Sequence, residues 1–206
     1  MKLENGTRVL FLGDSITDAA RDRADFHGMA GYPQMVDNYI KTFFAEKNIE
    51  CINRGISGDT TEMLLMRMER DCFELSPDAV SILIGINDVW RRYDSNKLTT
   101  VEAFRSNYRS ILEGVRRRLR CKIMVLEPFL LASDKSRDGY REDLDPKIAV
   151  VRELAREFAD EYVPLDGIFA EASVKNTPQY YSIDAVHPTR QGEALIAKEW
   201  LKRVKL

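Results

Sequence analysis

Residues 9–15 read Val-Leu-Phe-Leu-Gly-Asp-Ser. An apolar run of this length that stops at a glycine is typical of a β-strand buried on both faces, as strands of parallel sheets are. Two similar runs lie at 79–84 and 122–126, and weaker ones lie at 51–53 and 162–165. These runs predict the strands of a parallel sheet.

Helical patterns separate these runs, because apolar residues recur there at a spacing of three to four. The predicted helices span 31–47, 59–72, 101–119, 146–160 and 190–203. Their expected caps include Asp59, Thr99 and Asp145, which are residue types that favour helix starts. Strands that alternate with helices imply right-handed crossovers and a three-layer α/β domain.

Composition and charge narrow the class of protein. The 206 residues suit one domain spanning 1–206. The net charge of −2 argues against general nucleic-acid binding. No apolar run approaches the roughly 20 residues that cross a bilayer, and residues 1–8 contain no apolar stretch, so we expect no membrane segment or secretory signal and a cytoplasmic location.

The sequence has three cysteines, Cys51, Cys72 and Cys121, at wide spacing. We expect reduced structural thiols, as is usual in the cytosol. There is no Cys-x-x-Cys or paired-histidine motif, so we predict no metal site.

Small and amide residues follow the predicted strands at 13–17, 53–60 and 85–88, and another polar segment lies at 184–188. Ligands of open α/β sheets bind beyond the carboxyl ends of the strands, so these segments mark the expected site. Only two histidines, His27 and His187, could serve as a base near neutral pH. His27 has no motif around it and is predicted to be an exposed loop residue.

Together, the four segments resemble the motif blocks of the SGNH hydrolases, also called the GDSL esterase/lipase family. The resemblance implies a flavodoxin-like sandwich with a five-stranded parallel sheet. It also implies that Ser15 is the nucleophile, His187 the general base and Asp184 the acid partner of His187. The backbone N–H groups of Ser15 and Gly58 and the side-chain amide of Asn87 would then form the oxyanion hole. No cofactor is implied.

These residue types suit acyl transfer. A serine hydroxyl is a weak nucleophile until a base takes its proton, and imidazole has a pKa suited to that task. A carboxylate fixes the imidazole tautomer. The absence of a Cβ at Gly58 lets the backbone approach a substrate, and the neutral amide of Asn87 can stabilise an oxyanion without trapping an anionic product.

The extended block 84–94 is similar to that of the intracellular bacterial acetylxylan esterases of the same family. Trp90 and Tyr93 within it offer flat faces for a sugar ring, and Asp14 is a further candidate at the substrate site. Those enzymes carry a tryptophan before the catalytic aspartate, whereas this chain has Ile183. Residues 128–143 form a long polar segment, and long loops at this edge of a sheet are often functional.

We therefore expect a serine esterase that removes acetyl groups from xylo-oligosaccharides or other small carbohydrates through an acyl-enzyme intermediate. The resemblance also suggests a homo-oligomer. A thioesterase or lysophospholipase of the same family is the first alternative. A flavodoxin-like small-molecule binder is an alternative from another class, although no strict phosphate-loop motif supports it.

Overall fold

The computed structural model describes residues 1–206 and contains one parallel sheet with the strand order β2-β1-β3-β4-β5. The strands are β1 (Arg8–Gly13), β2 (Glu50–Gly55), β3 (Ala79–Leu83), β4 (Lys122–Leu126) and β5 (Glu161–Val163). All five coincide with predicted runs. The predicted α/β class and the five-stranded parallel sheet are confirmed.

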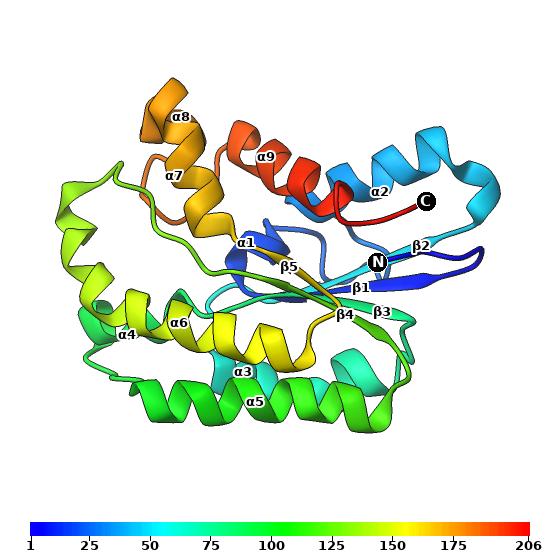
Figure 1. Cartoon of the computed structure of the whole chain (residues 1–206), viewed down its shortest axis with the longest axis horizontal. Coiled ribbons are helices and arrows are strands. Elements are labelled where there is room, and N and C mark those ends of the chain that lie inside the picture. The colour runs from blue at the N-terminus through cyan, green and yellow to red at the C-terminus, as the bar shows by residue number, and fades with distance from the viewer.

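Helices cover both faces of the sheet (Figure 1). They are α1 (Ser15–Asp18), α2 (Gly31–Phe43), α3 (Thr61–Met66), α4 (Asn87–Ser95), α5 (Val101–Arg118), α6 (Arg141–Phe158), α7 (Leu165–Lys175), α8 (Pro178–Tyr181) and α9 (Arg190–Leu201). Three shorter turns are η1 (Ala45–Lys47), η2 (Glu69–Phe73) and η3 (Lys135–Tyr140). In Figure 1, α2, α7 and α9 lie on one side of the sheet and α3, α5 and α6 on the other. None of these helices combines the length with the apolar character that a membrane-spanning segment needs.

The alternation of side chains along β1 explains why the strand is apolar throughout. Val9 and Phe11 belong to the core beneath α2 and α9, whereas Leu10 and Leu12 belong to the core beneath α3 and α5. Successive residues of a strand point to opposite faces, so a sheet with two covered faces needs an unbroken apolar run. The three cysteines are free and buried.

Register aligns the strand ends that support the site. Gly13 at the end of β1 pairs with Gly55 of β2 on one side and with Leu83 of β3 on the other. The segments that follow these three strands therefore leave the sheet side by side. This alignment brings the segments that carry Ser15, Gly58 and Asn87 to the same edge of the sheet.

The predicted helix starts at 31, 101 and 190 match α2, α5 and α9, but the three expected cap residues were wrong. The side chain of Thr60, not Asp59, caps α3 by accepting from Met63 N. Thr100, not Thr99, caps α5. Helix α6 begins at Arg141, four residues before the expected cap Asp145, because the turn η3 leads directly into it.

Candidate active site

Ser15 is held at the start of α1 by a tight strand-to-helix turn. A Cβ on Gly13 would lie 2.3 Å from the carbonyl oxygen of Leu83, so only glycine fits there. The side chain of Asp14 caps α1 by accepting a hydrogen bond of 3.0 Å from Ile16 N. The turn therefore places Ser15 directly beyond the carboxyl end of β1.

Three side chains form a continuous hydrogen-bonded line. Ser15 Oγ lies 2.9 Å from His187 Nε2, and His187 Nδ1 lies 2.7 Å from Asp184 Oδ2. The other oxygen of Asp184 accepts hydrogen bonds from the backbone N–H groups of His187 at 2.7 Å and Val186 at 3.1 Å. Ala185, which lies between Asp184 and Val186, has a left-handed φ of 69°. This backbone conformation folds the segment tightly enough for the Asp184 carboxylate to bind both its own loop and the imidazole of His187.

The charges along this line favour proton acceptance by His187. The hydrogen bond to Asp184 raises the pKa of His187 above its ordinary value, although burial opposes the shift. Burial would raise the pKa of Asp184, but its hydrogen bonds with His187 and with two backbone N–H groups hold it well below 3.8. Asp184 therefore stays ionised and can stabilise an imidazolium. The line can move a proton from Ser15 Oγ to His187.

Two further acids of the motif blocks are buried beneath the site. Burial raises the pKa of Asp14 to about 7, and the side chain is 1% exposed. Burial also raises the pKa of Asp88 to about 6, and its carboxylate accepts hydrogen bonds from the N–H and hydroxyl groups of Thr61. The burial of Asp14 argues against its predicted contact with substrate and gives it the role of a helix cap.

Three donors are available for an oxyanion. The N–H groups of Ser15 and Gly58 donate to no other group of the protein. Gly58 has a φ of 90°, a conformation that side-chain-bearing residues rarely adopt. Asn87 Nδ2 donates a hydrogen bond of 3.0 Å to the carbonyl oxygen of Asp59, which fixes the amide and leaves its second N–H free.

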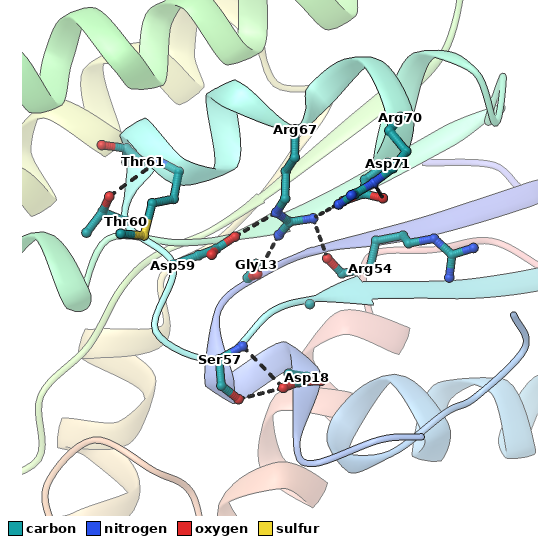
Figure 2. A network of polar contacts seen from close by, with 12 residues as sticks. Gly13, Asp18, Arg54, Ser57, Asp59, Thr60, Thr61, Arg67, Arg70 and Asp71 are labelled. Carbon is teal, nitrogen blue, oxygen red and sulfur yellow. Dashed lines mark hydrogen bonds and ion pairs between the residues drawn. The ribbon is translucent and has the colours of Figure 1, made fainter. Parts of the chain in front are cut away.

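Arg67, which no sequence motif marks, ties these segments together (Figure 2). Its guanidinium donates to Asp59 Oδ2 at 2.6 Å, to the carbonyl oxygen of Arg54 at 2.8 Å and to that of Gly13 at 3.1 Å. It also pairs with Asp71 at 3.1 Å. One side chain thus joins the ends of β1 and β2 to the loop that carries Gly58.

A second polar link holds the same loop from the opposite side. Asp18 at the end of α1 accepts hydrogen bonds from the hydroxyl of Ser57 at 2.5 Å and from its N–H at 3.2 Å (Figure 2). Asp18 also pairs with Arg23. The Ser57-Gly58 segment is therefore held relative to α1 as well as to the sheet.

A cavity of about 350 Å³ opens beside the serine and the imidazole. Its lining residues are Ser15, Ile16, Ala19, Ala20, Ser57, His187, Pro188 and Glu193. Glu193 has no motif signal beyond its nearness to His187 in the chain. The cavity is mixed, with apolar carbons on the α1 side and polar groups around the reactive pair.

Of the two aromatic side chains predicted at the substrate site, Trp90 lies beside the triad. Its ring centroid is 5.6 Å from that of His187, and the guanidinium of Arg137 lies 3.9 Å above it. The ring of Tyr93 instead stacks on Tyr140 at 4.2 Å, and its hydroxyl donates to the carbonyl oxygen of Gly139. The contacts of Tyr93 hold the segment 128–143, which brings Arg137 to the site.

His27 takes no part in this cluster, since its side chain is 62% exposed and its nearest carboxylate oxygen, on Glu50, is 3.9 Å away. Ile183, which precedes Asp184, is 74% exposed. No group of three or more His, Cys, Asp or Glu side chains is arranged to hold a metal ion.

Comparisons with known proteins agree with this geometry. The acetylxylan esterase of Geobacillus stearothermophilus is 32% identical over 99% of this chain and 96% of that protein. Its crystal structure superposes with a TM-score of 0.89 over 98% of this chain and 95% of the other. Structures of that enzyme described as catalytic mutants carry replacements of a serine, an aspartate and a histidine.

Two other similar proteins are described by other activities. A protein of Parabacteroides merdae described as a GDSL-like lipase superposes with a TM-score of 0.92 at 32% identity, over 97% of this chain and 96% of that one. Thioesterase 1/protease 1/lysophospholipase L1 of Escherichia coli K12 is 27% identical over 95% of this chain and 81% of that protein.

The model of the GDSL-like lipase/acylhydrolase family matches residues 11–195. The match begins within β1 and ends within α9, so it includes the segments that carry both Ser15 and His187. Because it spans most of the sequence and every motif block of the site, this chain belongs to the GDSL-like lipase/acylhydrolase family.

Proposed function

We propose that this protein is a serine esterase that hydrolyses acetyl esters, with O-acetyl groups on xylo-oligosaccharides or other small carbohydrates as its substrates. The observation that carries the proposal is the Ser15-His187-Asp184 line, with distances of 2.9 and 2.7 Å, beside three free donors. The family is one of carboxylic ester hydrolases, and the relative from Geobacillus supports the acetyl group and the sugar.

In the first half of the reaction, neutral His187 takes the proton of Ser15 as Oγ attacks the acetyl carbonyl carbon. The carbonyl oxygen becomes an oxyanion, which accepts hydrogen bonds from Ser15 N, Gly58 N and Asn87 Nδ2. Each such donor is worth roughly 3–4 kcal/mol in the transition state. The C–O bond to the alcohol then breaks, and the imidazolium gives its proton to the departing oxygen, which leaves an acetyl-serine.

In the second half, water takes the place of the alcohol. His187 removes a proton from the water as the water oxygen attacks the acetyl carbon, and the same donors hold the new oxyanion. The bond to Ser15 Oγ breaks and Oγ regains a proton from His187. The product leaves as acetic acid, which gives its remaining proton to water and becomes acetate. Asp184 keeps the imidazole in the required tautomer throughout both halves.

The surroundings of the triad support a hydroxylated substrate. Trp90 presents an aromatic face and Arg137 a cation beside His187, and both are features that bind sugars in water. The resemblance to the Escherichia coli enzyme keeps thioesterase or lysophospholipase activity as the alternative.

The test uses Ser15→Ala and a series of p-nitrophenyl esters. We expect Ser15→Ala to lower kcat roughly 10⁴- to 10⁶-fold while the circular dichroism spectrum stays that of the wild type. Phenylmethylsulfonyl fluoride should add one covalent group to Ser15, detected by mass spectrometry. Undiminished turnover of the variant would refute the nucleophile, and a preference for chains of about eight carbons over acetyl would favour the alternative.

A further inference from the structure

Glu193 is a carboxylate beside the reactive pair that has no partner in the protein. It lies in the first turn of α9 and lines the same cavity as Ser15 and His187. Its side chain takes part in no hydrogen bond and no ion pair, although it is half-buried. The Glu193 oxygens are not among the fully buried side-chain atoms without a partner, so they reach the solvent of the cavity and are open to a ligand.

The structure makes room for this carboxylate. Gly31, at the start of α2, has a φ of 59°, and a Cβ there would lie 3.3 Å from Glu193 Oε1 and 2.5 Å from the Cβ of Ala19. A side chain at residue 31 would therefore press on both Glu193 and the wall of the cavity. The glycine leaves the carboxylate seated between α2, α9 and the segment after α1.

The chemistry of the cavity selects the kind of ligand. Glu193 accepts hydrogen bonds but donates none when ionised, and no lysine or arginine lines the cavity. The hydroxyl of Ser57 donates to Asp18, so its oxygen faces the cavity's ligand chiefly as an acceptor. Burial raises the pKa of Glu193 against the opposing charge of Arg190, so hydrogen-bond donors on a ligand would stabilise the ionised carboxylate. A neutral molecule rich in hydroxyl donors fits this set.

The position of the cavity beside His187 indicates that it binds the alcohol half of the ester and not the acyl half. His187 must hand its proton to the departing oxygen, so the alcohol lies against the imidazole. Pro188 and Glu193 line the same cavity as His187. A volume of about 350 Å³ is more than a two-carbon acyl group needs and lies within the range of small-ligand sites. The carbons of Ile16, Ala19 and Ala20 can cover one face of a sugar ring.

We propose that Glu193 is a specificity-determining residue that accepts hydrogen bonds from hydroxyls of the alcohol half of the substrate, and so selects esters of polyhydroxylated, uncharged alcohols. This inference rests on the proposed esterase function. It adds to that function a named contact that distinguishes a sugar from a simple alcohol.

The test measures kcat/KM for two acetate esters in the wild type and in variants of Glu193. One is a mono-acetylated methyl xyloside, and the other is p-nitrophenyl acetate, whose alcohol has no second hydroxyl. In Glu193→Leu, we expect the ratio of kcat/KM for the sugar ester to that for p-nitrophenyl acetate to fall about 10- to 100-fold, the range for hydrogen bonds to a charged group. Glu193→Gln keeps one acceptor oxygen and should lie between Glu193→Leu and the wild type.

The matched control is Glu102→Gln, which changes an exposed carboxylate in the first turn of α5, on the opposite face of the sheet. Its ratio should equal that of the wild type. An unchanged ratio in Glu193→Leu overturns the proposal, even if both activities drop. So does a wild-type enzyme that hydrolyses p-nitrophenyl acetate but not the sugar ester. Hydrolysis of p-nitrophenyl acetate that depends on Ser15 would, in either case, leave the esterase function standing.

Discussion

Asp184 binds its own loop with one oxygen and the imidazole of His187 with the other. The short spacing of these two residues, three positions apart, is therefore enough to build both the turn and the orientation of the base. An amide in place of the carboxylate could accept from the backbone with its oxygen, but its NH₂ group would face the ring and favour the wrong tautomer. The ionised state of Asp184 is thus as important as its position.

Replacement of Asp184 should change both the level and the pH dependence of activity. His187 acts as a base only when neutral, and its pKa is raised, so wild-type kcat/KM should rise with pH through a midpoint above 6.5. In Asp184→Asn the negative charge is lost, so the midpoint should move to lower pH and the plateau should fall roughly 10⁴-fold. Initial rates with p-nitrophenyl acetate from pH 5 to 9 measure both. Identical midpoints would disprove the coupling.

At the scale of elements, this sequence predicts the strands more accurately than the residues that cap the helices. The run at 9–12 must be apolar on both faces, and this requirement is visible along the chain without any knowledge of partners. Thr60 and Asp59 are both good caps by type, and the choice between them depends on Arg67, which binds Asp59 across the sheet edge. The residues around Asp59 in the sequence do not reveal this ion pair, so they could not predict which residue caps the helix.

Site residues that act through contacts with distant parts of the chain were likewise not predictable from the local sequence. Ser15, Asn87 and His187 lie in motifs that identify them, and the structure brings their segments to one edge. Arg67 and Glu193 carry no motif, because each acts through a contact with a residue far away in the chain or with a ligand. The sequence offers Trp90 as a face for a sugar ring, but its distance from His187 could be known only once α4 and the triad loop were placed together.

Arg67 joins three elements, so its loss should disturb catalysis as well as stability. It is 9% exposed, and removal of one partner of a buried ion pair costs about 3 kcal/mol or more. We expect Arg67→Met to lower the free energy of unfolding by about 3 kcal/mol. It should lower kcat more than it raises KM, because Asp59 and Gly13 position the oxyanion donors.

Arg70→Met is the control for this variant. Arg70 also pairs with Asp71, but its side chain is 69% exposed, so its loss should cost less than about 1 kcal/mol and leave kcat unchanged. Urea unfolding and steady-state kinetics on both variants separate the two cases. An unchanged kcat in Arg67→Met, measured where the urea curve shows the variant fully folded, would mean that Arg67 only stabilises the fold. Partial recovery of kcat in Arg67→Lys would support positioning.

At the scale of the molecule, the site exists only when the whole sheet is formed. Ser15 and His187 are 172 positions apart, and their hydrogen bond closes nearly the full length of the chain. The strand order β2-β1-β3-β4-β5 puts the first strand in the interior of the sheet, so the serine turn is flanked on both sides by segments that arrive later in the sequence. Both layers of helices must therefore pack before the three donors and the base can meet.

This dependence predicts that residues 1–206 unfold as one cooperative domain. Trp200 packs 5.5 Å from Phe11 beneath α2 and α9, and its indole donates to Ser81 of the central strand β3. The two tryptophans, Trp200 in α9 and Trp90 in α4, both pack against the core beneath α2 and α9. The layer of α3, α5 and α6 contains no tryptophan, so fluorescence reports that core while far-ultraviolet circular dichroism reports all helices. The two signals and the esterase activity should follow one curve in guanidinium chloride. A fluorescence change that precedes the loss of helix would show that the two faces of the sheet unfold separately.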